Sequence, residues 1–247
     1  MDRTYVVTGA ASGIGAATTS YLRERGSRVV TCDLHHAEVA ADLTTETGRV
    51  ELVAGVTRLS GGRIDAIVAV AGGGPPQTSL QLNFFGTVAT LEGLRPLLAA
   101  SLAPRAVVVS SIASYSPTDP VLVEACLSLD EPRAIAAALE FATKTAPLDQ
   151  MTEAQGLKVG LDLYANAKHA LNCWCRRAAV KAEWAGAGIA LNVVAPGFID
   201  TPAAAYILAD PERRAAWGAW YRCAEHIRVA QSRWPRSSPG ASARKIR

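Results

Sequence analysis

The sequence predicts an α/β fold in which helices flank one doubly wound parallel sheet, and three observations support it. Apolar runs of strand length alternate with helical patterns along most of the 247-residue chain. The run Ile64 to Val70 is predominantly apolar, which is typical of a strand buried on both faces. A glycine-rich turn joins the first strand-like run directly to a helical stretch. With 49% hydrophobic residues, the chain can build one sizeable core.

The elements follow in order along the chain. Strands are predicted near residues 5, 29, 52, 67, 107 and 191, the third of them over Arg49 to Val56. Helices are predicted over Gly15 to Arg25, Leu82 to Leu98 and Pro132 to Thr143, and another one carries Tyr164 and Lys168 toward Trp184. The stretch Lys144 to Gly160 is polar, and we expect it to be a loop.

The turn after the first strand predicts a phosphate-binding loop. Glycine allows backbone conformations that other residues avoid, and a helix N-terminus supplies amide donors with partial positive charge. The spacing is Gly-x-x-x-Gly-x-Gly, unlike the Gly-x-Gly-x-x-Gly of other dinucleotide folds, and three glycines also suit an ordinary turn. The candidate contacts to a dinucleotide here are Gly9, Ser12, Gly13, Ile14 and Gly15.

Two carboxylates follow at positions that suit the adenosine part of such a cofactor. Asp33 ends the second predicted strand, where a carboxylate can accept from ribose hydroxyls and would repel a 2′-phosphate. No Arg or Lys adjoins it, so NAD is favoured over NADP; the alternative is a solvated aspartate that caps the turn. Asp42 and Leu43 are candidates for the adenine site, although Asp42 equally suits a helix cap.

A second group of polar residues is predicted at the carboxyl edge of the same sheet. Ala71 and Gly72 follow a strand and leave room for a ribose and nicotinamide, while Ser111 ends the next strand and competes with Ser110 for a catalytic role. Tyr164 and Lys168 lie one helical turn apart, so the ammonium can favour the phenolate of a group that ionises near about pH 10 in water. By itself, this pair also suits any exposed helix.

Composition excludes several other classes of protein. The net charge of +3 is small and partly due to the C-terminal tail, so we expect no nucleic-acid partner. The five cysteines lack metal-ligand spacing, which predicts no metal site and fits a reducing cytoplasm. The chain enters its first strand by residue 5 and has no apolar run of membrane-spanning length, so neither a signal peptide nor a membrane anchor is expected.

Together these motifs resemble the short-chain dehydrogenase/reductase family, from residue 3 to about residue 225. The matching residues, in order, are Thr8 to Gly15, Asn83, Ser111, Tyr164, Lys168 and Pro196-Gly197. The segments 71–78, 108–114 and 200–202 are similar to one subgroup, the bacterial 3α-hydroxysteroid dehydrogenase/carbonyl reductases and their coniferyl-alcohol dehydrogenase relatives. The resemblance implies a Rossmann-type sheet and an NAD-dependent alcohol dehydrogenase or carbonyl reductase.

The resemblance also implies a role for each matching residue. Tyr164 would exchange the proton with the substrate oxygen, Lys168 would hold the nicotinamide ribose, and Ser111 would stabilise charge on that oxygen. Asn83 would kink its helix and hold a water that links Lys168 to solvent. Pro196 and Gly197 would form the floor under the nicotinamide ring, and Ile199 and Thr201 would orient its carboxamide.

The chain departs from the family pattern in three places. Ser111 and Tyr164 are 53 residues apart, so about 115–163 is predicted to be an insertion. One interpretation is that it alters the helix-to-helix surface by which the family usually dimerises, with a homodimer as one alternative for this chain. The other interpretation is a lid over the substrate. The segment Ala203 to Tyr221 is rich in aromatics that suit a flat apolar ligand or helix packing. The last strand of the family is missing: we expect one catalytic domain over 1–230 and a basic, disordered tail over 231–247.

The substrate predicted from the subgroup is a small apolar alcohol or ketone, cyclic or aromatic and hydroxysteroid-like. Two alternatives remain open at this point. One is a coniferyl-type primary alcohol, and the other is a catalytically impaired, NAD-binding remnant, because the site residues are present while the last structural element is missing.

Overall fold

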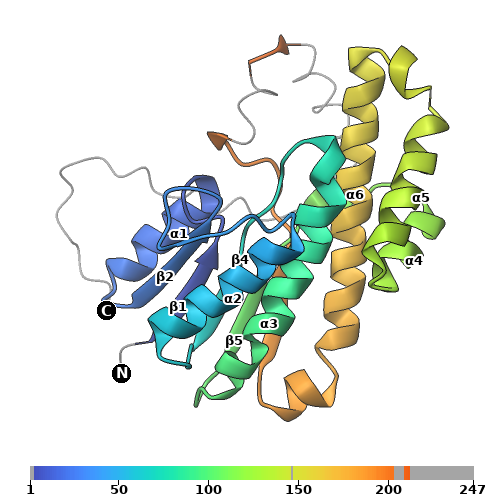
Figure 1. Cartoon of the computed structure of the whole chain (residues 1–247). Helices are drawn as coiled ribbons and strands as arrows, with labels where there is room; N and C mark the ends of the chain where they lie inside the picture. The colour runs from blue at the N-terminus through green and yellow to red at the C-terminus, as the bar shows by residue number, and fades with distance from the viewer. Residues whose placement is uncertain (1–2, 146, 203–208, 212–247) are drawn as a thin grey trace, which may run out of the picture. The chain divides into compact units, whose positions relative to one another are not determined.

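A computed structural model describes residues 3–145, 147–202 and 209–211, and it divides the chain into two units, residues 1–206 and 207–247. The first unit is a parallel sheet of six strands in the order β3-β2-β1-β4-β5-β6, flanked by helices (Figure 1). The strands are β1 (Thr4–Thr8), β2 (Arg28–Asp33), β3 (Val39–Ala40), β4 (Ala66–Ala69), β5 (Arg105–Val109) and β6 (Ala190–Val194). The predicted fold class is therefore confirmed.

The helices are connected in the same alternating order. They are α1 (Gly13–Arg23), α2 (Glu46–Ser60), α3 (Thr87–Ala99), α4 (Pro120–Leu127), α5 (Glu131–Thr143) and α6 (Glu153–Ala178). Short 3-10 turns lie at Pro76–Thr78, Ile112–Tyr115 and Leu148–Gln150, and π-helical turns at Gln81–Gly86 and Ala182–Gly186. The helix predicted to continue to Trp184 thus ends at Ala178, and Trp184 lies in the separate π-helical turn.

Both faces of the central strands are covered, as the apolar runs predict. Val6 and Val7 are adjacent in β1 and both have no exposed surface, yet they belong to two different clusters of buried side chains. The Val6 cluster includes side chains of α2, α3 and α6, and the Val7 cluster packs against Leu22 of α1. Helices therefore lie on opposite sides of the sheet.

The strand predicted over Arg49 to Val56 is wrong, because this segment belongs to α2. Its buried residues Leu52 and Val56 are four apart, which is helical spacing. Val50, two residues before Leu52, lies on the other face of the helix and is 64% exposed. Thr45 caps the helix by accepting from the amide of Gly48, and Gly61 ends it in a left-handed conformation. The sixth strand is instead the two-residue β3, which pairs with β2 at Cys32 and Asp33.

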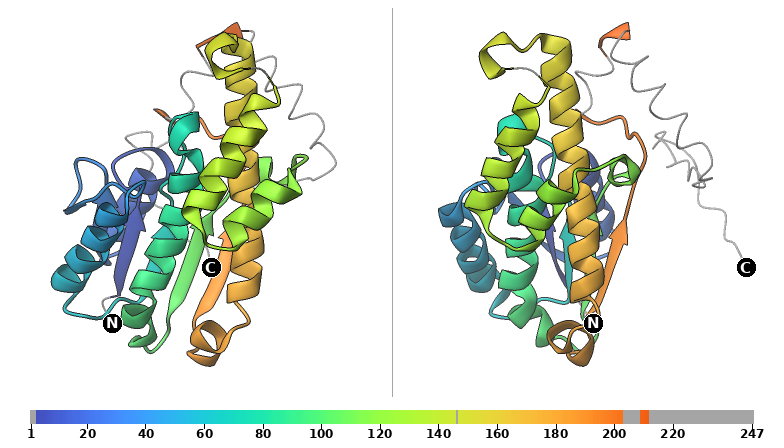
Figure 2. Two further views of the ribbon diagram at one scale, coloured as in Figure 1. Left: turned by 45° about the vertical axis from the view of Figure 1, so that its right-hand side comes forward. Right: turned by 90° about the vertical axis from the view of Figure 1, so that its right-hand side faces the viewer.

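The loop predicted over Lys144 to Gly160 is also wrong in its second half. Helix α6 begins at Glu153, behind a capping box in which Thr152 and Gln155 satisfy each other's backbone amides. Helix α4 packs against both α5 and α6, and Figure 2 shows the α4 and α5 pair alongside α6. The segment between β5 and α6 is therefore largely helical and covers one side of α6.

Strand β6 forms one edge of the described sheet. Its Leu191 and Val193 pack on the larger core cluster, whereas Asn192 and Val194 are exposed, Val194 by 48%. Within the described residues no strand follows it, and the predicted tail 231–247 and most of the aromatic segment Ala203 to Tyr221 lie outside those residues.

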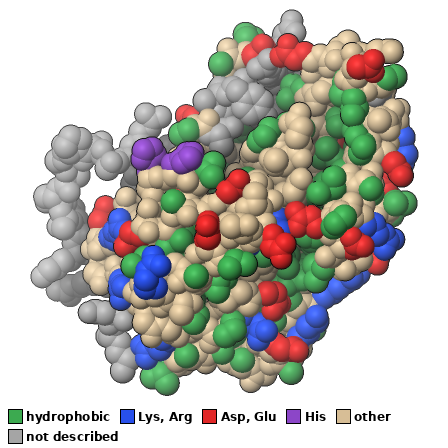
Figure 3. Space-filling model, viewed as in Figure 1, with side chains coloured by type: hydrophobic (Ala, Val, Ile, Leu, Met, Phe, Trp, Pro, Cys, Tyr) green, Lys and Arg blue, Asp and Glu red, His purple; other side chains and the backbone are tan. Residues whose placement is uncertain are grey.

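The described part of the chain contains no helix long and apolar enough to span a bilayer. Within it, no three His, Cys, Asp or Glu side chains are grouped so that they could bind a metal ion. Basic and acidic side chains are interspersed over the face of the molecule that Figure 3 shows.

Candidate functional site

The site is built where β1, β2, β4, β5 and β6 end at the carboxyl edge of the sheet. In open parallel sheets ligands bind at this edge, beside the point where the strand order reverses. Here β1 and β4 are neighbours. The chain passes from β1 to β2 on one side of this pair and from β4 to β5 on the other. The loops after these strands carry the residues that the sequence predicts.

The glycine loop after β1 is packed too closely for larger residues. Gly9 has a positive φ of 66°, and a Cβ on it would lie 2.9 Å from the backbone of Ala71 after β4. A Cβ on Gly15 would lie 2.0 Å from the Gly9 carbonyl oxygen, so α1 begins directly against the loop. Gly13 faces Thr201, whose Cγ2 would be 3.1 Å from such a Cβ. The structure thus brings Ala71, Thr201 and the glycine loop together.

Helix α1 begins at Gly13, within the glycine loop itself. Ser12 is the N-cap residue, but its side chain makes no capping hydrogen bond. The first amides of a helix have no partners within the helix, so they can donate to an anion. Ser12 and Ile14 are, respectively, exposed and partly exposed, as contacts to a ligand require.

Asp33 lies beside the glycine loop at the tip of β2. Its Oδ2 accepts from the amide of Ala11 at 2.9 Å, and its Oδ1 accepts from the amide of Leu34 at 2.7 Å. The carboxylate is therefore held by backbone donors and partly exposed, and each oxygen keeps a second lone pair for a further donor. This geometry differs from a solvated aspartate, because it fixes the carboxylate next to the loop.

Asp42 and Leu43 lie in the loop that leads into α2. The Oδ1 of Asp42 accepts from both the amide and the hydroxyl of Thr44, at 2.9 and 2.7 Å. The N-cap of α2 is Thr45, so the alternative of Asp42 as the helix cap is not what the structure shows. The side chain of Leu43 is buried, with 6% exposed.

Lys168 is the most unusual charged group of the site, because its side chain is 2% exposed. Its Nζ donates to the carbonyl oxygen of Val109, at the end of β5, over 3.1 Å. The Nζ also lies 5.7 Å from the centre of the Tyr164 ring, one helical turn earlier in α6. Burial lowers the pKa of Lys168 to about 8, because desolvation disfavours the charged ammonium.

Asn83 joins the same group from the π-helical turn 81–86. Its side chain accepts from the amide of Gly73 at 2.9 Å and donates to the Gly73 carbonyl at 3.0 Å, which clamps that backbone from both sides. A Cβ on Gly72 would lie 2.9 Å from Asn83 Oδ1 and 3.1 Å from Lys168 Nζ. Only glycine fits at this point, since both polar atoms converge on it.

Ser111 follows β5 and is the N-cap residue of the short 3-10 turn Ile112–Tyr115. Its Oγ accepts from the amide of Ala113 at 3.1 Å, which leaves the hydroxyl proton to donate elsewhere. Ser110 is 3% exposed, and its Oγ has no hydrogen-bond partner among the described residues. The partly exposed Ser111 is thus the better placed of the two for contact with a ligand.

Two residues that sequence reasoning did not assign hold this serine turn against α6. His169 places its Nδ1 2.9 Å from the Ser114 carbonyl oxygen, and Asn172 donates to the Ser114 hydroxyl at 2.8 Å. His169 is partly buried in this contact. Asn172 lies one turn after Lys168, so helical spacing was the signal that could have identified it.

The loop after β6 closes the remaining side. The carbonyl of Pro196 accepts from the amide of Ile112 at 3.0 Å, so this loop is tied to the serine turn. Gly197 is partly exposed and Ile199 is 45% exposed, while Thr201 faces the glycine loop. The predicted site residues thus line one continuous edge, from Asp33 to Thr201.

A curated relative decides the family. The 3-alpha-hydroxysteroid dehydrogenase/carbonyl reductase of Comamonas testosteroni is 37% identical over 210 residues, which are 83% of this chain and 76% of that protein. The chain belongs to the short-chain dehydrogenase family. Residues 3–122 match the family model described as short chain dehydrogenase, and residues 150–231 match one described as enoyl-(acyl carrier protein) reductase. This short-chain dehydrogenase is an oxidoreductase, as the predicted motifs implied.

Solved structures agree with this assignment. The short-chain dehydrogenase superimposes on the 3-alpha-hydroxysteroid dehydrogenase of Pseudomonas sp. B-0831, solved with NADH, with a TM-score of 0.74 and 37% identity over 87% of this chain and 80% of that one. A ligand-free aldohexose dehydrogenase of Thermoplasma acidophilum shares the fold at a TM-score of 0.60 and 19% identity, covering 89% and 78% of the two chains.

Proposed function

We propose that this short-chain dehydrogenase uses NAD to interconvert an alcohol and a carbonyl on an apolar cyclic or aromatic substrate. The observation that carries the proposal is the convergence of Lys168, Asn83 and Gly72 beside Tyr164. A buried cation next to a phenol is the arrangement that an acid/base tyrosine needs near neutral pH. Burial of an ammonium destabilises the fold, which favours a functional role for Lys168.

The described residues fit a dinucleotide along this edge. The amides at the start of α1 suit a pyrophosphate, Asp33 suits ribose hydroxyls, and the space at Gly72 suits the ribose next to Lys168. Once bound, the nicotinamide supplies the hydride donor or acceptor.

The chain's own side chains then manage the proton. The Tyr164 phenolate takes the proton of the substrate hydroxyl, and in the reverse direction the phenol returns it to the carbonyl oxygen. The Lys168 ammonium favours the phenolate form. The Ser111 hydroxyl donates a hydrogen bond to the same substrate oxygen and stabilises charge that develops there. Asn83 keeps the Gly73 backbone fixed beside Lys168.

The preference for NAD is a testable part of this proposal. We expect the protein to bind NAD at least about tenfold more tightly than NADP, about 1.4 kcal/mol, because Asp33 repels a 2′-phosphate. Asp33→Asn keeps an acceptor for the Ala11 amide but removes the charge, so NADP should gain affinity. Asp33→Ala should erode the preference further, since the acceptor is also lost. Fluorescence titration with each cofactor measures both changes.

Glu124→Gln is the matched control, because this exposed carboxylate lies on α4 and its loss should leave both affinities unchanged. Equal affinity of the unsubstituted protein for NAD and NADP would show that Asp33 does not select the cofactor.

The substrate class rests on the relatives and on the residues near the site. Both 37%-identical relatives are 3-alpha-hydroxysteroid dehydrogenases by name, and Ile199 and Tyr115 are exposed apolar side chains on the loops after β6 and β5. We therefore expect NADH formation with a member of a hydroxysteroid panel, followed by absorbance. Turnover of coniferyl-type alcohols alone would replace the steroid assignment. Binding of NAD without turnover of any panel member would identify a catalytically impaired remnant.

We also propose the domain organisation and location given by the sequence. The catalytic domain extends over 1–230 with an insertion at about 115–163, which is supported by residues 123–149 lying between the two family matches. Described cysteines Cys32, Cys126, Cys173 and Cys175 are free thiols, which fits the cytoplasm.

A further inference from the structure

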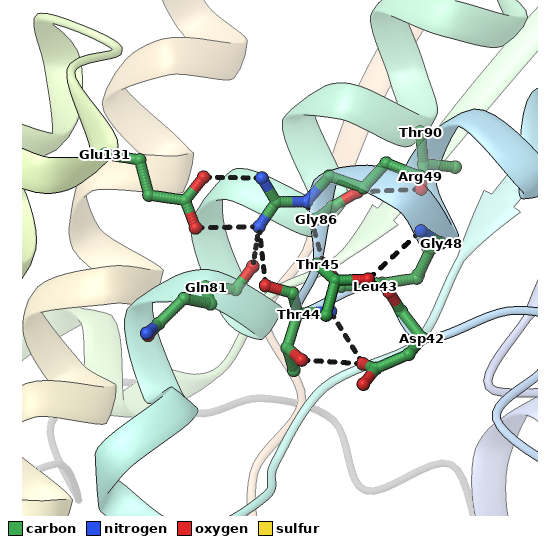
Figure 4. A network of polar contacts seen from close by, with 10 residues as sticks. All are labelled: Asp42, Leu43, Thr44, Thr45, Gly48, Arg49, Gln81, Gly86, Thr90 and Glu131. Atoms are coloured by element: carbon green, nitrogen blue, oxygen red, sulfur yellow. Dashed lines mark hydrogen bonds and ion pairs between the residues drawn. The ribbon is translucent and has the colours of Figure 1, made fainter.

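One charged side chain outside the proposed catalytic group is largely buried and fully paired. Arg49 lies in the first turns of α2, its side chain is 12% exposed, and its guanidinium contacts three separate segments (Figure 4). The Nε donates to the Leu43 carbonyl at 2.8 Å, and one terminal nitrogen donates to the Gln81 carbonyl at 3.1 Å. Both terminal nitrogens also bind the Glu131 carboxylate, at 2.5 and 3.0 Å.

Two of these contacts join the two ends of the proposed cofactor site. Leu43 belongs to the 42–44 loop, which we assign to the adenine side, and Arg49 also approaches the Thr44 carbonyl at 3.4 Å. Gln81 is the first residue of the π-helical turn that carries Asn83. The loop and the turn touch directly, since a Cβ on Gly86 would lie 2.7 Å from the Leu43 carbonyl oxygen.

The third contact comes from a different part of the chain. Glu131 is the first residue of α5, and it lies between the two segments that match the family models, residues 3–122 and 150–231. A guanidinium at 12% exposure needs a compensating anion, because burying an unpaired charge is costly. The fork geometry of arginine matches both oxygens of one carboxylate, so Glu131 also fixes how the guanidinium is turned.

We propose that Arg49 is a positioning residue that holds the 42–44 loop and the Asn83 turn in register, and that Glu131 of α5 orients it. The inference rests on the proposed function, because it assigns these two segments to the adenine and nicotinamide sides of one cofactor. Its consequence is that a helix without any proposed cofactor contact contributes to cofactor affinity through a single ion pair.

The first test uses the full chain without cofactor and measures amide hydrogen exchange. Arg49→Met should raise exchange at least about tenfold in both 42–44 and 81–86, because one side chain holds them. Arg49→Lys should restore only part of the protection, since an ammonium cannot donate to three segments at once. Arg95→Met is the matched control: Arg95 pairs with Glu92 within α3, and its loss should leave both segments unchanged.

The second test measures NAD affinity of the folded protein by fluorescence. Arg49→Met should raise Kd at least about tenfold, and Glu131→Gln, which keeps the side-chain shape, should raise it by about threefold or more. Adding Glu131→Gln to Arg49→Met should have no further effect, because the carboxylate acts through the guanidinium.

The two tests separate this inference from the proposed function. If the unsubstituted chain fails to bind NAD, the cofactor assignment is wrong, while hydrogen exchange still decides whether Arg49 holds both segments. If Arg49→Met lowers only the melting temperature, with exchange in 42–44 and 81–86 and NAD affinity as in the control, the positioning role is overturned. Should Arg49→Met not fold, Glu131→Gln alone gives the same two readouts.

Discussion

Tyr164→Phe is expected to lose at least about a hundredfold in turnover while keeping its affinity for NAD within about twofold. General acid/base catalysis contributes about 10²–10⁴ to rates, and phenylalanine keeps the ring but has no proton to transfer. The ring contact with Lys168 Nζ, at 5.7 Å, can persist without the hydroxyl. Turnover is followed by NADH absorbance with a substrate found in the steroid panel, and affinity by fluorescence titration.

The matched control for this change is Tyr21→Phe, at a 41%-exposed position on α1 away from the proposed proton path. It should leave turnover and affinity unchanged. Retention of more than about a tenth of the activity by Tyr164→Phe would assign the acid/base step to another group.

Lys168→Met is expected to stabilise the cofactor-free protein at pH 7 while removing activity. Burial lowers the pKa of Lys168 from 10.5 to about 8. At a pH at which Lys168 is charged in both the folded and the unfolded chain, its burial therefore costs the folded state about 3 kcal/mol. Loss of the hydrogen bond to Val109 offsets about 1 kcal/mol. The net gain should be about 2 kcal/mol in the free energy of unfolding, measured with urea.

The stability difference between Lys168→Met and the unsubstituted protein should depend on pH. Between about pH 8 and pH 10.5 the unfolded chain binds the Lys168 proton and the folded chain does not, so the unsubstituted protein gains stability as pH rises. The advantage of Lys168→Met should therefore shrink across this window and reverse above it, where only the loss of the hydrogen bond to Val109, about 1 kcal/mol, remains. Lys181→Met, at an exposed lysine, should show no such trend. A Lys168→Met variant that is less stable at pH 7 would show that the lysine's contacts outweigh its desolvation.

The sheet could be predicted from the sequence wherever a strand is long and buried on both sides. Strands β1, β2 and β4 have this character, β5 and β6 are apolar runs with exposed positions such as Arg105 and Asn192, and the positions of all five were predicted. Strand β3 could not be, because two residues have no period and it exists only through pairing with Cys32 and Asp33. The error at Arg49 to Val56 was avoidable, since Thr45 and Gly61 bracket a helix.

The candidate site was predictable where one residue type carries the chemistry. Glycines, an acidic strand end and a Tyr-x-x-x-Lys pair can be recognised locally, and the structure brings them to one edge. The supporting contacts were not predictable, because they join residues far apart in sequence: His169 with Ser114, and Arg49 with Glu131, which are 55 and 82 positions apart. Only the packing of α6 and α5 brings such pairs together.

The long connection from β5 to β6 has a consequence for how the chain tolerates added sequence. These strands are neighbours, yet residues 110–189 separate them, more than twice the length that the connection would have without the proposed insertion at about 115–163. Closing a loop costs only about 0.6 kcal/mol more for each doubling of its length. Leu122, Cys126 and Ala134 are each at most 1% exposed, and burying one such leucine contributes about 2 kcal/mol. The burial of such side chains in α4 and α5 therefore exceeds the added cost of closing the longer connection, so loop closure does not limit the length of sequence between β5 and β6.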